Sequence, residues 1–194
     1  MNEFILFGTT HIITLITIFT ISFGFAFYVK DSYVQHNFLT FEKCLAFVLI
    51  INELVKPFYL IALGEGAYRW TNTVPLHACH ISSYATGLFL LTRNQKLFDF
   101  AYFWGFGGGT MALLTPDIEL TFPDLDFITL FSGHGLLFFA LIYITFVIRQ
   151  TITFSSFKNA LKYSLMILPI MYLLNVLIGG DPGYEANLWY LMKA

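Results

Sequence analysis

Long apolar runs alternate along this chain with short polar connectors. A helix that crosses a hydrocarbon core of about 30 Å needs about 20 apolar residues, and somewhat fewer where flanking side chains reach the interface. Six runs approach that length, at 12–29, 45–63, 76–91, 97–114, 127–148 and 160–178. The pattern therefore predicts an all-α membrane protein with six transmembrane helices, of which the run at 76–91 is the shortest.

The composition indicates a lipid environment and a single unit. The chain is 57% hydrophobic and 11% charged, whereas a soluble domain carries about 25% charged residues. With ten Lys and Arg and a net charge of −2 it offers no basic patch, so nucleic acid is not an expected partner. No linker-like stretch interrupts the sequence, and residues 1–194 are expected to form one membrane domain.

The distribution of Lys and Arg predicts the orientation, because cationic residues in short loops are retained on the cytoplasmic side. The odd-numbered connectors hold Lys30, Lys43, Arg93, Lys96, Arg149, Lys158 and Lys162. The even-numbered side holds Arg69 and Lys193, and its connector at 117–126 is acidic. We therefore expect a multi-pass protein of the cell membrane whose amino terminus and even-numbered connectors are extracytoplasmic.

The fourth run contains a glycine-rich stretch at 105–112 with small residues four apart. Small residues let helix backbones approach closely in lipid, so the stretch predicts a packing seam. No Lys-Ser/Thr pair follows it and no strand precedes it, which argues against a phosphate-binding loop.

Polar side chains that could carry chemistry converge on the expected extracytoplasmic leaflet. An ionisable group inside a bilayer costs about 2.5 to 3.5 kcal/mol, so each one requires a partner or a cavity. His77, Cys79 and His80 lie at the outer end of the third run, and His134 lies in the outer half of the fifth. The remaining candidates at this level are His11, Asp117 and Asn187.

Cys79 is the candidate nucleophile. It follows Pro75 and lies one turn inside an expected helix, whose positive amino-terminal end favours a thiolate, while burial in lipid opposes it. The alternative is a small apolar packing residue. The second cysteine, Cys44, is expected at the opposite membrane face, too far away to form a disulfide.

Glu53 and Lys56 stand three residues apart near the middle of the second run, beside Pro57. At that spacing on a helix the two charges can neutralise each other. We interpret them as a paired structural charge. In the alternative, Glu53 is a partner of a histidine or of a lipid headgroup.

A zinc site is the alternative use of the histidines. His and Cys are usual zinc ligands, and His77 and His80 are spaced to chelate an ion together with Cys79. The surroundings are hydrophobic and offer no obvious carboxylate, so we expect no metal and no other cofactor.

Five segments of the chain resemble the YwaF-like bacterial membrane proteins, which are related to the eukaryotic transmembrane protein 164. The segments are Phe-Gly-Thr-Thr-His at 7–11, Pro-Leu-His-Ala-Cys at 75–79, the stretch 104–117, Phe-Ser-Gly-His-Gly at 131–135 and Asn-Leu-Trp-Tyr-Leu at 187–191. They span nearly the whole chain in the right order. Ala78 stands where relatives often have a larger apolar residue. Relatives also continue into a further hydrophobic segment, so the comparison allows for the loss of a further carboxyl-terminal helix.

The resemblance implies an acyltransferase that moves a fatty acyl chain from a phospholipid to a lysolipid through a cysteine-bound intermediate. The family cysteine falls on Cys79 and the family histidine on His134, which would act as acid and base. Phospholipid and lysophospholipid are then the expected partners, with the oligomeric state and headgroup left open. The supporting residues of such a site would be His11, Glu53, His77, His80, Asp117 and Asn187.

Three alternatives to acyl transfer stay open at this point. Similar membrane hydrolases that use Thr and His in comparable places make a lipid ester hydrolase the neighbouring alternative. A transporter would use Glu53, Lys56 and the histidines as a polar path through the membrane. In a non-enzymatic scaffold the same groups would simply bond one another.

Overall fold

The computed structural model describes residues 2–33, 37–64, 66–181, 183 and 185–192. These residues form seven α-helices and one 3₁₀ helix, and no strand occurs among them. The helices are α1 (Thr9–Val29), α2 (Leu39–Leu63), α3 (Trp70–Thr73), α4 (Ala78–Thr92), α5 (Gln95–Leu114), α6 (Leu125–Phe146), α7 (Phe154–Ile178) and the 3₁₀ helix η1 (Leu188–Tyr190).

The six long helices coincide with the six apolar runs, and the expected all-helical class is confirmed. The third run differs most, because His77 has an extended backbone (φ −61, ψ 159) and α4 begins only at Ala78. Its 15 residues rise about 22 Å, less than the hydrocarbon core. Four helices, α1, α2, α6 and α7, are long and apolar enough to cross a membrane. The chain is therefore a multi-pass membrane protein, and the count of six crossings stays a prediction.

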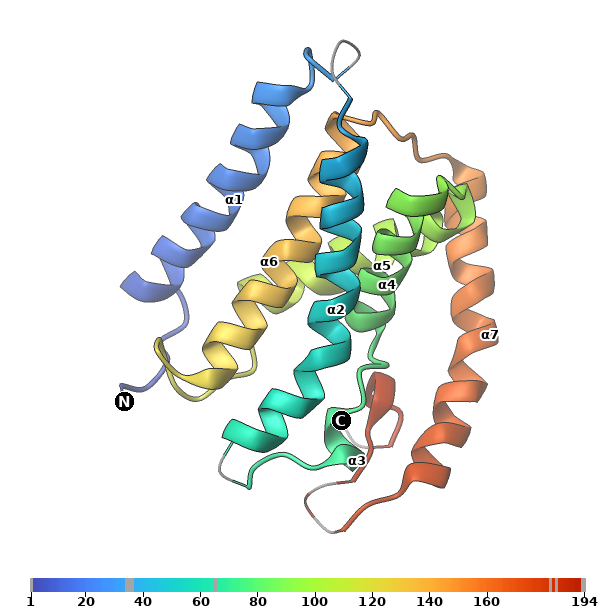
Figure 1. The fold of residues 1–194 in the computed structure, drawn as a ribbon. Coiled ribbons are helices and arrows are strands. Elements are labelled where there is room, and N and C mark those ends of the chain that lie inside the picture. The colour runs from blue at the N-terminus through green and yellow to red at the C-terminus, as the bar shows by residue number, and fades with distance from the viewer. Residues whose placement is uncertain (1, 34–36, 65, 182, 184, 193–194) are drawn as a thin grey trace.

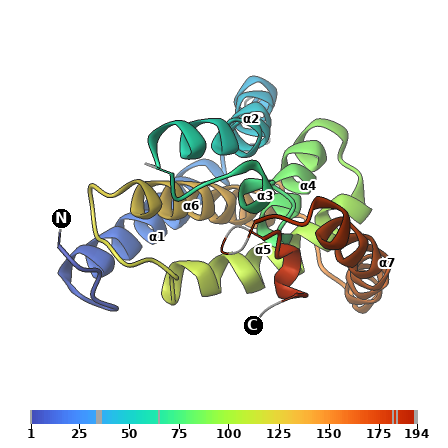
Figure 2. The same ribbon diagram turned by 90° about the horizontal axis from the view of Figure 1, so that it is seen from below.

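Helix α6 forms the centre of the bundle. It packs against α1, α2, α4 and α5, and α7 joins the outside through α5 and η1. Figure 2 shows α6 in the middle, with α2 on one side, α5 running across the other and α1 at the left. The central position agrees with the buried residues of α6, which include Leu137, Leu141 and Tyr143.

The helix order separates two ends of the bundle. At the lower end of Figure 1, α1 and α6 begin, while α2 and α7 end; we call this the cavity end. The opposite end carries Lys30, Arg93, Arg149 and their cationic neighbours and is called the cationic end. Lys193, which the sequence assigns to the extracytoplasmic side, lies outside the described residues.

The amino-terminal segment is attached to the connector between α5 and α6. Glu3 and Leu120 form an antiparallel bridge, in which Phe4 N–H donates to the Glu119 carbonyl at 2.8 Å. The two segments therefore lie on the same side of the membrane, as the alternation of connectors requires. Which side that is stays a prediction.

The glycine-rich stretch of α5 packs against α6 only in part. A Cβ on Gly105 would lie 2.6 Å from Leu141 Cδ1, so this glycine allows close approach of the two helices. A Cβ on Gly107 or Gly108 would instead meet no atom of another helix within 4 Å. The expected seam is thus confirmed at Gly105, while the middle of the stretch faces open space.

A buried polar network ties the helices together at the cationic end. Glu42 on α2 is 2% exposed. Its Oε1 accepts hydrogen bonds from the hydroxyls of Tyr33 at 2.8 Å and Tyr143 at 3.1 Å, and its Oε2 accepts one from the guanidinium of Arg93. Burial, followed by the bond to Glu42, raises the pKa of Tyr33, so its hydroxyl remains a donor at neutral pH.

A second network at the same end connects α5 to α7. The Asp99 carboxylate is 1% exposed. It accepts hydrogen bonds from Gln95 Nε2 and Asn159 Nδ2, each at 2.7 Å. Both oxygens of this buried carboxylate therefore have protein partners, as a buried charge requires.

Candidate functional site

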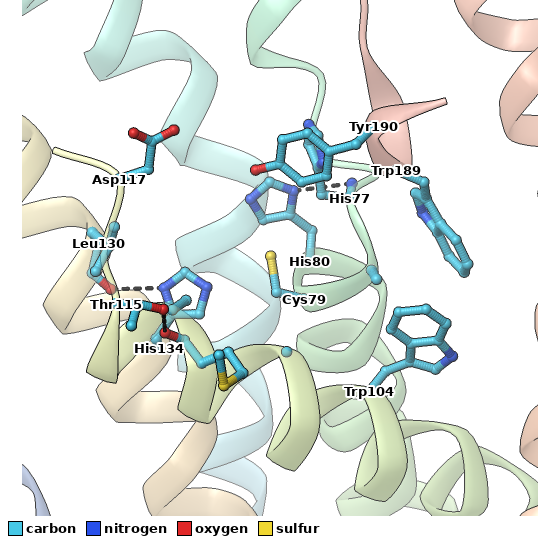
Figure 3. A pocket seen from close by; sticks show the side chains of 14 residues that line it. His77, Cys79, His80, Trp104, Thr115, Asp117, Leu130, His134, Trp189 and Tyr190 are labelled. Carbon is cyan, nitrogen blue, oxygen red and sulfur yellow. Dashed lines mark hydrogen bonds between the residues drawn. The ribbon is translucent and has the colours of Figure 1, made fainter. Parts of the chain in front are cut away.

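A cavity of about 500 Å³ opens at the cavity end between α4, α5, α6 and the carboxyl-terminal segment. Figure 3 shows the thiol of Cys79 and the imidazoles of His80 and His134 directed into it. The full lining consists of His77, Ala78, Cys79, His80, Trp104, Gly108, Met111, Ala112, Thr115, Asp117, Leu130, His134, Trp189 and Tyr190. The structure thus brings together four of the candidate residues of α4 and α6, with Asp117 beside them.

The first turn of α4 positions three of these side chains. Cys79 is the second residue of the helix, and His77 is its N-cap. The backbone N–H of His77 donates to His80 Nδ1 at 3.2 Å, so the neutral His80 ring carries its proton on Nε2. The turn holds the Cys79 thiol (partly buried and free) at the positive end of the helix dipole.

His134 is held in one tautomer by the backbone of α6. Its Nδ1 lies 2.9 Å from the Leu130 carbonyl oxygen, and because a carbonyl can only accept, the hydrogen resides on Nδ1. The neutral ring therefore presents the lone pair of Nε2. In Figure 3 this second nitrogen lies on the side of the ring that faces Cys79. This is the arrangement that a general base needs.

Cys79 and His134 line two pockets in common. Both line the main cavity and a smaller pocket beneath it. Within the described residues no hydrogen bond joins the two side chains, and an approach within hydrogen-bond or one-water reach stays a prediction. Catalytic hydrogen bonds often tighten only when substrate binds, and both side chains line the cavity that a substrate would enter.

The floor beneath Cys79 carries an ion pair. Lys56 Nζ lies 2.9 Å from Glu53 Oε2, which confirms the expected pairing. The same oxygen lies 3.5 Å from His80 Nε2, so Glu53 is also the histidine partner considered in the alternative. A Cβ on Gly133 would lie 3.3 Å from Lys56 Nζ. The glycine before His134 thus lets this pair approach the α6 backbone.

Two tryptophans form one wall of the cavity, and the sequence had not marked them as site residues. Trp104 on α5 and Trp189 have ring centroids 4.9 Å apart. The Trp104 indole donates to Ser164 Oγ at 2.6 Å, and the Trp189 indole donates to the Leu76 carbonyl at 2.9 Å. The sequence signal for both was their position inside segments of the resemblance, Trp104 at the start of 104–117 and Trp189 within 187–191.

Asp117 and Tyr190 stand at the mouth of the cavity. Both are exposed, and the Tyr190 ring lies 5.5 Å from the ring of His77. Partial burial, and then the negative charge of Asp117, raises the pKa of Tyr190. The hydroxyl therefore stays protonated at neutral pH and can donate a hydrogen bond at the entrance.

Two of the candidate supporting residues lie away from the cavity lining. His11 is 1% exposed; its Nδ1 accepts from Phe7 N–H at 3.0 Å and its Nε2 donates to the Leu113 carbonyl at 2.8 Å. Nδ1 thereby bonds the turn that precedes α1, and Nε2 fastens α1 to the end of α5. Asn187 precedes η1, where its side chain accepts from Met192 N–H at 3.0 Å. Both positions shape the surroundings of the cavity.

The donors and acceptors around the cavity suit acyl chemistry. Among the described residues no group of three or more His, Cys, Asp or Glu side chains is arranged to hold a metal ion. The available parts are a thiol, an imidazole with a free lone pair and further imidazoles. Apolar and aromatic walls surround them. Such a set can transfer a proton and form a thioester in a space that admits a hydrocarbon chain.

Comparison with known proteins identifies a family over almost the whole chain. The family model described as the TMEM164 family matches residues 6–194. No curated protein matches this sequence, and no solved structure matches it. The matched residues include the first turn of α4, the start of α6 and the carboxyl-terminal segment, which together form the cavity.

Proposed function

This chain belongs to the TMEM164 family, and from that premise we propose that it is a phospholipid-dependent acyltransferase that works through a thioester on Cys79. The observation that supports this proposal is the cavity shared by the Cys79 thiol and His134. The Leu130 carbonyl holds the proton of His134 on Nδ1. A nucleophile and an oriented base therefore face one space inside a membrane protein.

In the first half-reaction, His134 Nε2 takes the proton from the Cys79 sulfur. The thiolate attacks the ester carbonyl of the donor phospholipid and forms a tetrahedral adduct. The bond from the carbonyl carbon to the glycerol oxygen then breaks, and the imidazolium returns its proton to the departing lysolipid. The fatty acyl group is left on Cys79 as a thioester.

In the second half-reaction, the hydroxyl of an acceptor lysolipid gives its proton to His134 and attacks the thioester. The bond between carbon and sulfur breaks, a new ester forms, and the thiolate regains the proton. Water attacking in place of the lysolipid would make the enzyme a lipid ester hydrolase. The two activities share their first half and differ in which hydroxyl reaches the thioester.

The supporting residues have distinct roles in this scheme. We assign to His77, whose imidazole lines the cavity, the hydrogen bond to the oxyanion of the tetrahedral adducts. His80 directs its Nε2–H towards Glu53 at 3.5 Å, which orients the ring beside Cys79. Asp117 and Tyr190 stand where a polar headgroup would rest at the mouth.

The proposed setting is the outer leaflet of the cell membrane, within one six-crossing domain. Its support is the clustering of cationic connectors at the end of the bundle opposite the cavity. Single cysteines introduced at Glu119 and Arg93 in a Cys44→Ser/Cys79→Ala background test the orientation. A membrane-impermeant maleimide should label position 119 in intact cells, and labelling of position 93 alone would reverse the proposed orientation.

Acyl transfer is tested directly in vesicles. The purified protein is mixed with a phospholipid that carries one deuterated acyl chain and with an unlabelled lysophospholipid. We expect the deuterated chain to appear on the acceptor with wild-type protein and not with Cys79→Ala. Transfer by the Cys79→Ala protein at the normal rate would refute the proposal, whereas release of free deuterated fatty acid alone would favour the hydrolase.

A further inference from the structure

The carboxyl-terminal segment 185–192 lies across the cavity end of the bundle. Figure 2 shows it between the end of α7, α3 and α5. Trp189 and Tyr190 of this segment line the cavity. Since the ends of membrane-spanning helices face water, the segment stands between the cavity and the aqueous phase.

A buried side chain of α7 fixes the segment in place. Asn175 is 2% exposed. Its Nδ2 donates to the Leu188 carbonyl at 3.0 Å, and its Oδ1 accepts from the Leu188 N–H at 2.7 Å. One amide thus satisfies both polar groups of a backbone that is itself buried, with Leu188 2% exposed. Removing the amide would leave both backbone groups without these partners.

The aromatic residue that follows adds a second anchor to the same segment. Trp189 donates through its indole to the Leu76 carbonyl at 2.9 Å, two residues before α4 begins. Its backbone is left-handed, with φ 59, a conformation that costs a non-glycine residue free energy. The surrounding contacts hold Trp189 there, against Trp104. The segment is therefore a fastened wall that ends beside the reactive turn of α4.

We propose that Trp189, held by the Asn175 clamp, determines specificity by reserving the Cys79 thioester for a lipid hydroxyl and excluding water. This inference rests on the proposed function, because it concerns the fate of the thioester. The thioester carbon accepts a hydroxyl oxygen, the bond to sulfur breaks and the proton passes to the sulfur. Water and the lysolipid hydroxyl can each attack the thioester carbon in this way. Exclusion of water therefore selects transfer over hydrolysis.

The ratio of hydrolysis to transfer tests the inference. Vesicles contain the deuterated phospholipid and the unlabelled lysophospholipid, and mass spectrometry measures free deuterated fatty acid against deuterated product lipid. Each ratio is internal to one sample, so the amount of folded protein does not alter it. Trp189→Ala should raise the ratio by about tenfold, equivalent to 1.4 kcal/mol in the competition between the two hydroxyls.

Asn175 supplies the decisive variant, since it is absent from the cavity lining. Asn175→Ala should raise the ratio as Trp189→Ala does, because it releases the same segment. The matched control is Asn159→Ala, which removes a partly buried amide from the other end of α7 and its bond to Asp99. That variant should lose stability and leave the ratio unchanged.

The outcomes separate this inference from the proposed function. An unchanged ratio in both Trp189→Ala and Asn175→Ala would overturn the inference while transfer itself stands. A change in Trp189→Ala alone would refute the part assigned to Asn175. Mainly free fatty acid from the wild-type protein would also overturn it, and a wild type that releases and transfers no acyl chain would refute the proposed function instead.

Discussion

The two ends of this bundle bury polar groups in opposite ways. At the cationic end, the Glu42 carboxylate accepts hydrogen bonds from Tyr33, Tyr143 and Arg93. At the cavity end, His134 bonds one backbone carbonyl through Nδ1 and turns its other nitrogen towards a cavity. A cluster whose polar groups all have protein partners holds helices together, whereas a cluster that faces a cavity keeps polar groups that can bind a substrate. The difference assigns stability to one end and chemistry to the other.

The first test of this comparison removes the proposed general base, His134, and has the largest expected effect. His134→Ala should lower the rate of acyl transfer by about 10²- to 10⁴-fold, the usual contribution of a general acid or base. Unfolding in detergent should change little, because among the described residues the ring is hydrogen-bonded to Leu130 of its own helix alone. Combining the change with Cys79→Ala should cost no more than Cys79→Ala alone, since nucleophile and base act as a unit.

A rate that falls only in proportion to the folded fraction would assign His134 a structural role. His134→Gln provides the companion measurement, because its amide can occupy similar space without serving as a base at neutral pH. The two variants should be equally slow.

The second test of the comparison removes the buried Glu42 carboxylate at the cationic end. Glu42→Ala should lower the free energy of unfolding by about 1 to 3 kcal/mol, because it removes the buried acceptor of the Tyr33 and Tyr143 hydroxyls. The rate of transfer per folded molecule should remain that of the wild type. Unfolding curves in mild detergent measure the first quantity, and vesicle assays normalised to folded protein measure the second.

The double variant Glu42→Ala/Arg93→Ala sharpens this result. It should be less unstable than the sum of the two single variants, because Glu42→Ala removes the buried carboxylate that Arg93→Ala alone leaves without its cation. Additive losses would show that the ion pair contributes nothing specific. Loss of activity in folded Glu42→Ala protein would contradict the division between the two ends.

The third comparison uses two glycines with different surroundings. Gly107→Ala should stabilise the protein by about 0.5 to 1 kcal/mol, because alanine favours a helix and the new methyl meets open space. At Gly133 the methyl would lie 3.3 Å from Lys56 Nζ and 3.5 Å from Asn52 Nδ2. Gly133→Ala should therefore gain no stability and should slow transfer, since it displaces the Glu53–Lys56 pair below Cys79. Equal stability gains at both positions would contradict the close approach of Lys56 and Asn52 to the backbone at Gly133.

The smallest effect is expected at the second cysteine. Cys44 is exposed and free, in the first turns of α2 at the cationic end. Cys44→Ser should leave the unfolding free energy within about 0.5 kcal/mol of the wild type and should leave transfer unchanged. A marked loss of transfer would show that the wrong thiol had been assigned.

The positions of the long helices were predictable from the sequence because lipid imposes a length and a polarity on each crossing. The run at 12–29 corresponds to α1 at 9–29, for example. The start of α4 was harder, since the apolar run begins before the extended His77. Convergence of Cys79 and His134 followed from the topology alone, because alternate helix ends share a membrane face.

The wall made by Trp189 was not predictable in the same way. Its position depends on Asn175 and on the Leu76 carbonyl, and neither partner carries a local sequence pattern. The Glu42 network was missed for a related reason, because its partners come from three separate segments. His11 shows the opposite error. A histidine at the expected depth was grouped with the site, yet its bond to Leu113 uses it in packing.

The most direct test of the central claim is the intact mass of Cys44→Ser protein after incubation with a diacyl phospholipid and no acceptor. The account predicts one added fatty acyl group that neutral hydroxylamine removes, because a thioester is cleaved under conditions that spare an ester. The adduct should be absent from the Cys44→Ser/Cys79→Ala protein and should form slowly in Cys44→Ser/His134→Ala. An adduct of the same size on protein that lacks Cys79, or no adduct on protein that still transfers acyl chains, would contradict the thioester mechanism.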